Sequence, residues 1–271
     1  GADGVDGRSR TWFGLPHGGR KSLLLQTHIP RDPASGFPQG SMVMDFSPRQ
    51  FGVPGYVWLF PCLGEEGEPL YNAGISGGGF RRGDYARLRK AFLSVLDRHA
   101  ELRGAATPEL RFKAHAVRDY SPFQAPSRER VIYVGDQLGV DCITGEGLSI
   151  CAESAVAASQ EVVEALEGGD YTFRGYARRL RKCEFFPVYL VGRPFWIQRL
   201  SKRPSFLFSL ATCELPPGKE NVLDIYVRVY AGDIPAGTLF SSHYLEAVLR
   251  GFAGSLGGRL REAGGTSPSA R

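Results

Sequence analysis

The stretch YVGDQLGVDCITGEGLSIC, residues 133–151, puts an acidic turn and a glycine loop between two segments of regular structure. The apolar run RVIYVG, residues 130–135, leads into the turn and predicts a strand buried on both faces, as in a parallel sheet. After Gly147, apolar residues recur near a 3.6-residue period as far as residues 168–169, which are both glycine, and predict a long helix. The stretch therefore predicts a strand, a loop and a helix that begins at the loop.

The residue types in this loop favour a bound ligand. Asp136 follows the predicted strand directly, and carboxylates at the carboxyl end of a sheet strand often bind ligand hydroxyls. Gly145 and Gly147 allow the backbone to approach a flat or charged group. The helix that follows directs its unpaired N–H groups and its positive dipole end at the same place. We therefore expect a ligand with negative charge or an electron-rich ring, and a tight strand–helix connection without a ligand stays open.

The rest of the chain predicts a β-rich first half and a helical second half. Four apolar runs between Pro/Gly-rich turns predict a largely antiparallel sheet: KSLLLQTHI (21–29), SMVMDFS (41–47), GYVWLFPC (55–62) and LYNAGIS (70–76). A helix should follow with Asp84 as its N-cap, and residues 110–120 read as another strand. Helical patterns cover residues 171–211 and 242–256, and residues 221–232 fit a strand or a helix equally.

Composition and charge are those of an ordinary soluble protein. The 271 residues are 42% apolar and 23% charged, which suits one or two globular domains. The net charge of +5 comes from basic residues scattered along the chain, so we expect no nucleic-acid partner. Five cysteines without a CxxC pair predict neither a disulfide framework nor a metal site, and hence a reducing, cytoplasmic location.

Three motifs together resemble one superfamily. VGDQLGVDCITGEGL, residues 134–148, resembles the GD-motif segment of FAD-dependent oxidoreductases of the p-hydroxybenzoate hydroxylase type, and above all of the geranylgeranyl reductases. GADGVDGRSR, residues 1–10, resembles the DG motif of that superfamily. GYVWLFP (55–61) followed by YNAGISG (71–77) resembles the YxWxFP…NxG signature of the geranylgeranyl reductases. The resemblance implies an α/β (α+β) fold, with the remainder of a Rossmann-like FAD-binding domain and an antiparallel-sheet substrate domain.

The resemblance implies FAD as the cofactor. Asp3 and Gly4 would lie near its adenosine ribose and pyrophosphate, and Asp136 near its ribityl or pyrophosphate region. The loop 145–147 would pass the pyrimidine edge of the isoalloxazine, where the helix N-terminus stabilises negative charge. The full set of expected cofactor-binding residues is Asp3, Gly4, Gly135, Asp136, Gly139, Gly145, Glu146 and Gly147. The usual small pair after GD is replaced here by Gln137 and Leu138.

An aromatic strand marks the expected substrate side. Tyr56, Trp58 and Phe60 alternate, so in a strand they share one face. The pattern alone fits either a packed core or an apolar ligand wall, and the resemblance favours a wall for an isoprenoid chain. The expected substrate residues are Tyr56, Trp58, Phe60, Pro61, Asn72 and Gly74.

The implied activity is reduction of carbon–carbon double bonds in a geranylgeranyl chain, with NAD(P)H or ferredoxin as electron donor. The proton donor is unassigned, with Cys142, Glu146 and Tyr56 as candidates.

The chain carries no GxGxxG, the phosphate-binding motif that the superfamily places upstream of DG. We therefore expect a C-terminal portion of a longer protein, with the missing unit lost by truncation or supplied by another chain. The expected domains are the FAD-binding remainder (1–20 and 111–170), a β-rich substrate domain (21–110), a helical region (171–258) and a disordered tail (259–271). The aromatic and basic stretch 183–208 would suit peripheral contact with an anionic membrane.

Three other functions stay open at this point. A flavin-dependent monooxygenase or halogenase would share the DG and GD motifs. A non-catalytic remnant would bind prenyl lipids without flavin. A serine hydrolase would use Ser76 of GISGG (74–78) as the nucleophile of a GxSxG elbow, with Asp97 or Asp119 and His243 as partners.

Overall fold

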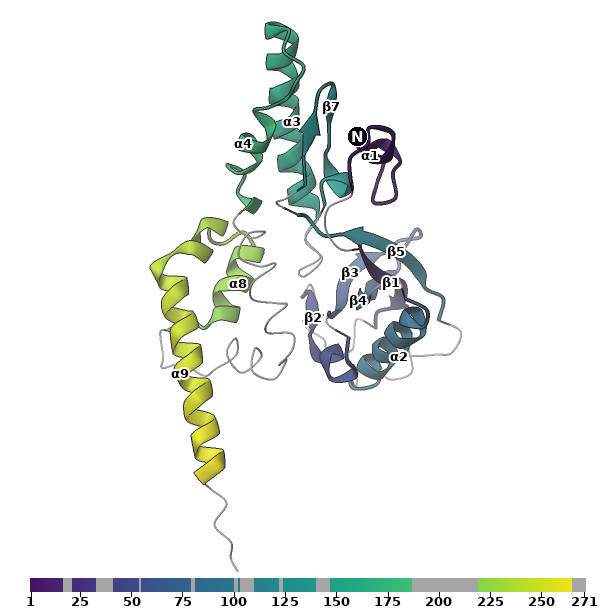
Figure 1. Cartoon of the computed structure of the whole chain (residues 1–271). Helices are drawn as coiled ribbons and strands as arrows, with labels where there is room; N and C mark the ends of the chain where they lie inside the picture. The colour runs from purple at the N-terminus through teal and green to yellow at the C-terminus, as the bar shows by residue number, and fades with distance from the viewer. Residues whose placement is uncertain are drawn as a thin grey trace, which may run out of the picture. The chain divides into compact units, whose positions relative to one another are not determined.

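The computed structural model has two compact units, residues 1–180 and 181–271, and each is described by itself. The structure describes residues 1–16, 21–32, 41–53, 55–78, 81–99, 102, 110–121, 124–139, 147–186 and 219–264. Unit 1 contains a β-sheet, the helix α2 and a group of elements around the helix α3 (Figure 1). Unit 2 is helical in its described part.

The sheet of unit 1 is antiparallel throughout, in the order β2-β3-β4-β1-β5 (Figure 1). Its strands are β1 (Lys21–Pro30), β2 (Val43–Asp45), β3 (Val57–Leu63), β4 (Pro69–Gly78) and β5 (Lys113–Arg118). The predicted antiparallel sheet is confirmed, and so is the strand expected within residues 110–120. The first and last strands in sequence pair with each other, and Lys21 at the start of β1 lies opposite Arg118 at the end of β5.

One face of the sheet carries the hydrophobic core. Alternate residues of the strands, such as Leu25, Leu59 and Ile75, are fully buried against α2 (Asp84–Leu96). This follows from the period of two along a strand and the period of 3.6 along the helix. Phe92 of α2 is fully buried and meets Phe112 edge-on, with ring centroids 5.3 Å apart.

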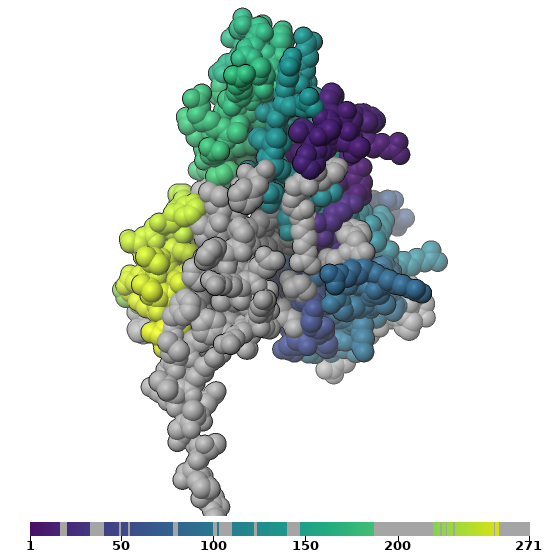
Figure 2. Space-filling model, in the orientation of Figure 1, coloured from purple at the N-terminus to yellow at the C-terminus, as the bar shows by residue number. Residues whose placement is uncertain are grey.

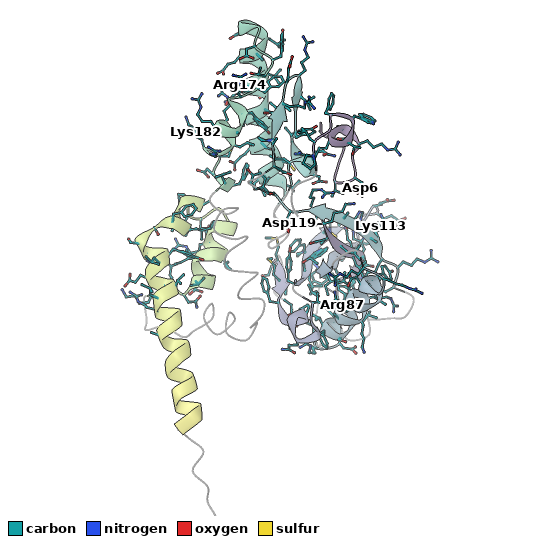
Figure 3. All side chains as sticks on the ribbon, viewed as in Figure 1. Asp6, Arg87, Lys113, Asp119, Arg174 and Lys182 are labelled. Atoms are coloured by element: carbon teal, nitrogen blue, oxygen red, sulfur yellow. The ribbon has the colours of Figure 1, made fainter. Side chains whose placement is uncertain are left out.

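The start of α2 corrects one prediction. Its N-cap is Gly83, with a φ of 93°, a conformation that favours glycine, so the assignment of Asp84 as N-cap is wrong. Asp84 is the first helical residue, and its carboxylate accepts the backbone N–H of Arg81 at 2.9 Å. The same carboxylate pairs with the guanidinium of Arg87 one turn later, at 2.6 Å. Arg87 is labelled in Figure 3.

The second group of unit 1 surrounds α3 (Leu148–Gly168), which confirms the predicted long helix and its glycine end. Gly169 caps α3 with a φ of 71°. The other elements of the unit are α1 (Ser9–Trp12), η1 (Ser47–Phe51), the hairpin of β6 (Ser127–Arg128) and β7 (Val131–Ile132), η3 (Gly135–Gln137), and α4 (Tyr176–Leu180). The fully buried hydroxyl of Tyr176 donates to the carbonyl of Tyr133 at 2.9 Å, which fixes α4 to the segment after β7.

The strand predicted over residues 130–135 is wrong in extent and in pairing. β7 is only two residues long and pairs antiparallel with β6. Its burial alternates, because Val131 and Tyr133 are buried while Ile132 and Val134 are half-buried. On the other side, the Gly1 amine donates to the Ile132 carbonyl at 2.5 Å, and the Val134 N–H donates to the Gly1 carbonyl at 3.1 Å. These two bonds flank Tyr133 in the pattern of a parallel pair, over one residue only.

Unit 2 consists, in its described part, of α8 (Val222–Tyr230), η4 (Ala236–Phe240) and α9 (Ser242–Gly264) around Ile225, Leu239 and Ala247. The ambiguous stretch 221–232 is therefore helical. A capping box explains the helix start, because Asn221 accepts the Asp224 N–H and Asp224 accepts the Asn221 N–H, both at 2.9 Å. The helix α9 continues to Gly264, into residues 259–271 that we predicted as a disordered tail.

The predictions for residues 187–211 lie outside the described residues, and so does most of the stretch 183–208 expected to contact a membrane. Within the part of the chain that the structure describes, no helix combines the length and the apolar character needed to cross a membrane.

Candidate cofactor and substrate site

The DG segment, residues 1–16, is a loop closed by its own carboxylate. Asp3 accepts the backbone N–H of Ser9 at 3.0 Å and the Ser9 hydroxyl at 2.7 Å. These hydrogen bonds lower the pKa of Asp3 below its ordinary value. Gly7 is needed inside the loop, since a Cβ there would overlap the Asp3 carboxylate. The described bonds of Asp3 thus maintain the loop, and its contact with a cofactor ribose stays a prediction.

Arg10 joins the DG segment to the GD segment, residues 124–139. Its side chain is fully buried, and its Nε donates to the Gln137 carbonyl at 3.0 Å. Its Nη1 reaches the Ala125 carbonyl at 3.3 Å, and its guanidinium lies 4.1 Å from the centre of the Tyr133 ring. Burial lowers the pKa of Arg10 from its ordinary value. Sequence reasoning missed Arg10, because nothing in its local pattern separates it from the exposed arginines.

The two residues that replace the small pair after GD are both buried, and Gln137 also holds this contact. Gln137 is buried, and its Nε2 donates to the Gly4 carbonyl at 2.5 Å. Leu138 is fully buried, and its carbonyl accepts the side-chain amide of Gln124. In Figure 2 the purple atoms of the DG segment lie against the teal atoms of the GD segment. The two segments that the resemblance assigns to FAD therefore form one packed body.

The GD turn lies beside the start of α3. Gly135, with a φ of 59°, begins the turn, and a Cβ there would lie 3.6 Å from the Cys151 sulfur in the first turns of α3. The N-cap of α3 is Gly147, which has no side chain to bind the first N–H groups, and Leu148 after it is 87% exposed. The half-buried Asp136 belongs to the same turn.

This arrangement fits an anionic cofactor. The N-terminal end of the 21-residue helix α3, where the helix dipole is positive, lies beside the GD turn. Gly4, with a φ of 78°, has open space where a Cβ would be, so a ligand could come close to its backbone. Gly139, with a φ of 100°, serves packing instead, because a Cβ there would lie 2.6 Å from the Tyr120 backbone. The predicted residues Cys142, Gly145 and Glu146 lie outside the described residues.

Five of the six predicted substrate residues lie on the sheet face opposite α2, whereas Pro61 falls on the core face, opposite the core residue Tyr71. Val57 and Leu59 point into the core, so Trp58 and Phe60 point to the other face. Tyr56, just before β3, is 2% exposed and Trp58 is 8% exposed, with ring centroids 6.1 Å apart. Phe60 and Pro61 are half-buried. Phe46 extends the aromatic row, with its ring centroid 5.4 Å from that of Tyr56.

The neighbouring strand β4 brings Asn72 and Gly74 to the same face. Phe60 pairs with Asn72, and Trp58 pairs with Gly74. The Trp58 Nε1 donates to the Asn72 Oδ1 at 3.1 Å. The structure thus brings together both halves of the predicted YxWxFP…NxG signature. Sequence analysis did not find the hydrogen bond, because it depends on the register between the two strands.

The hydrolase alternative is wrong. A nucleophile elbow needs its serine on the sharp turn between a strand and a helix. Ser76 lies inside β4, is 2% exposed, and its backbone N–H pairs with the Tyr56 carbonyl at 3.0 Å. The helix α2 begins only at Asp84. Ser76 is therefore a buried strand residue without the exposure of a nucleophile.

The chain is similar to three solved structures, each with a low sequence identity and a low TM-score. It matches 2-methyl-3-hydroxypyridine-5-carboxylic acid oxygenase (mutant Y270A) with 18% identity and a TM-score of 0.38, over 92% of this chain and 58% of that one. It matches FqzB with 20% identity and a TM-score of 0.39, over 86% of this chain and 60% of FqzB. It matches the halogenase PltM with 12% identity and a TM-score of 0.40, over 86% of this chain and 49% of PltM. TM-scores below 0.5 do not bear on the function.

The sequence comparison is more specific. No protein-family model matches the chain. Digeranylgeranylglycerophospholipid reductase 2 of Methanothermobacter thermautotrophicus is 32% identical over 169 residues, which are 62% of this chain and 41% of that protein. The chain thus spans less than half the length of this relative. With the motifs in their expected order, the match agrees with the resemblance of this stretch to the geranylgeranyl reductases.

Proposed function

We propose that the protein to which this chain belongs uses FAD to reduce carbon–carbon double bonds in an isoprenoid lipid. The observation that carries the proposal is the packed body of the DG and GD segments beside the start of α3, joined by Arg10 and Gln137. The name of the archaeal relative, a digeranylgeranylglycerophospholipid reductase, supports the lipid part of the proposal. The electron donor in this proposal is NAD(P)H or ferredoxin.

On the cofactor side, the chain would bind an anionic group by backbone rather than by charged side chains. When bound, FAD would supply the hydride for the reduction. Gly4, Gly135 and the start of α3 would receive its charged parts, and Asp136 would bind hydroxyls. Asp3 would fix the loop that contains Gly4, as its bonds to Ser9 do in the structure.

On the substrate side, the wall of Tyr56, Trp58 and Phe60 would orient an apolar chain and exclude water, with Asn72 and Gly74 beside it. An aromatic wall suits a hydrocarbon. Tyr56, Cys142 and Glu146 remain the candidates for the proton donor. Contact with a membrane surface through residues 183–208 would give access to a lipid substrate.

The test measures flavin first and substrate second. The full-length protein and this chain are each incubated with FAD and desalted. Absorbance bands of flavin should be retained by the full-length protein, whereas the chain, which carries no GxGxxG, should retain little. In the full-length protein Asp136→Ala should retain less flavin than the unchanged protein, whereas Asp170→Ala, a change at an exposed carboxylate after α3, should not. A colourless full-length protein would contradict the proposal.

The substrate step separates the proposal from its alternatives. The flavin-loaded protein is reduced without oxygen and mixed with a geranylgeranyl lipid. Reoxidation of the flavin together with loss of a double bond from the lipid is the expected outcome. Reoxidation only by oxygen, with a hydroxylated or halogenated product, would favour the monooxygenase or halogenase alternative. Lipid binding by a protein that retains no flavin would favour the non-catalytic remnant.

A further inference from the structure

The indole of Trp58 lies against the backbone of the neighbouring strand. Trp58 and Gly74 are direct cross-strand partners in β3 and β4. A Cβ at Gly74 would lie 2.5 Å from the Trp58 Cη2 atom and would overlap Cζ2, so the six-membered ring occupies the space of a side chain at position 74. A large aromatic ring placed over a glycine in this way shields the bare backbone and packs more closely than any pair with a Cβ.

The same edge of the indole is also held by a hydrogen bond. The Trp58 Nε1 donates to the Asn72 Oδ1 at 3.1 Å, two residues before Gly74 on the same face of β4. Trp58 is only 8% exposed, so its N–H depends on a partner within the protein. The amide thus holds Nε1, and the space above the glycine holds the neighbouring atoms Cζ2 and Cη2. These two contacts along one edge of the ring define both the position and the rotation of the indole.

We infer that Asn72 and Gly74 are positioning residues for Trp58 and act on the substrate through its indole. The inference rests on the proposed function where it concerns the substrate, because Trp58 is the wall for the isoprenoid chain in that proposal. A Cβ at position 74 pushes the ring off β4, and loss of the Asn72 acceptor lets it rotate. Either change alters the shape of the wall without removing an aromatic group from it. The spacing NxG therefore places the amide and the glycine on the same face of β4, along one edge of the indole.

The direct test follows the indole N–H. The chain contains three tryptophans, and the changes Trp12→Phe and Trp196→Phe leave Trp58 alone. In this background the single indole resonance of a 1H–15N spectrum reports the hydrogen bond. Asn72→Leu removes the acceptor at similar size, and Asn72→Asp keeps an oxygen in the same position. The N–H of Trp58 should exchange with solvent at least tenfold faster in Asn72→Leu than in the background or in Asn72→Asp. Equal exchange in all three proteins would overturn the inference.

A ligand measurement separates this inference from the proposed function. Geranylgeraniol is titrated into the same three proteins, and the fluorescence of Trp58 is recorded. The expected result is a change in emission in the background protein and at least a fivefold weaker affinity in Asn72→Leu, with Asn72→Asp close to the background. An equal affinity in all three would overturn the role of Asn72 in ligand binding. If geranylgeraniol does not change the fluorescence of the background protein, the result contradicts the isoprenoid proposal. The positioning role of Asn72 is then still tested by the exchange rates of the Trp58 N–H.

A double-substitution cycle distinguishes the loss of the Trp58–Asn72 contact from a general folding defect. Asn72→Leu is compared in the presence of Trp58 and of Trp58→Phe, which keeps an aromatic ring but has no N–H. If Asn72 acts through the indole, its replacement lowers the midpoint of thermal unfolding only where Trp58 is present. The same loss in both backgrounds would mean that Asn72 has another structural role, and would overturn the inference.

Discussion

The two parts of unit 1 are held together in different ways. In the sheet part, fully buried apolar side chains such as Leu59 and Phe92 pack between the strands and α2. In the part formed by the DG and GD segments, buried polar groups make the long-range contacts. Arg10 reaches Gln137 over 127 positions, and Gln137 reaches Gly4 over 133.

This difference has a physical consequence for stability. An apolar core loses free energy gradually when one side chain is shortened, because its neighbours still exclude water. A buried polar contact fails as a unit, because the group that remains loses its partner and stays out of water. The sheet part should therefore dominate the free energy of unfolding, while the DG and GD segments should separate locally at a lower cost.

The largest effect is expected in the sheet core. Phe92→Ala removes a fully buried ring and should lower the free energy of unfolding by about 3–5 kcal/mol. Urea unfolding followed by circular dichroism measures the loss. Tyr85→Ala on the same helix is the control, since Tyr85 is 44% exposed and should cost far less. Similar losses for both would show that the core does not dominate the stability of this part.

The next effect sharpens the contrast between the two parts. Arg10→Gln removes charged hydrogen bonds to two carbonyls and the contact with Tyr133, a loss of roughly 3 kcal/mol. We expect faster amide exchange in the DG and GD segments, while the exchange of β1, β3 and β4 stays unchanged. The exposed Arg8 provides the matched control, Arg8→Gln. Faster exchange across the sheet as well would mean that the two parts open together, and the comparison would be wrong.

A smaller effect is expected where the sheet contains a close backbone contact. Gly74→Ala forces Trp58 and the Leu25 carbonyl to move, and should cost about 1–3 kcal/mol. Gly168→Ala, at the open end of α3, should be neutral or stabilising, because helices favour alanine over glycine. Thermal unfolding of both variants measures the difference. If alanine is tolerated equally at both positions, the ring of Trp58 does not need the space above Gly74.

The smallest effect concerns acid stability of the sheet part. Burial raises the pKa of Asp45, but hydrogen bonds from Ser47 and His99 outweigh it and hold the pKa below its ordinary value. A carboxyl with a lowered pKa stabilises the fold above its unfolded pKa of about 4, and this contribution is lost as pH falls through the folded pKa. Asp45→Asn should therefore weaken the dependence of stability on pH below about pH 4. An unchanged dependence would show that Asp45 does not contribute to it.

The same contrast explains how much could be predicted from sequence. The strands of the five-stranded sheet, α2 and α3 follow from periods within a dozen residues, and they were predicted with small errors at their ends. The capping of α2 by Gly83 was missed, because Asp84 is also a good N-cap by type. The bond between Trp58 and Asn72 was missed, because the register of β3 and β4 depends on the turn at residues 64–67.

The polar contacts of the DG and GD segments were out of reach for a different reason. The sequence does not distinguish a buried arginine from an exposed one. Which carbonyls surround Arg10 depends on the folded chain. Gln137 and Leu138 looked like departures from a motif, and both prove to be buried packing residues. The segment 130–135 was predicted as a strand buried on both faces, because its apolar composition does not reveal that only two of its residues pair with β6.

The pairing of Lys21 with Arg118 has a consequence for the order of folding. Bringing Arg10 to Gln137 in an unfolded chain closes a loop of 127 residues. Once β1 and β5 have paired, the chain between them no longer counts toward the loop that the Arg10–Gln137 contact closes. The loop then has only about 30 residues, and the entropic cost of closing it is lower by on the order of 1 kcal/mol. The DG and GD segments should therefore meet after the sheet has formed. A variant that delays β5 would slow the formation of the candidate flavin site even though β5 contributes none of its predicted residues.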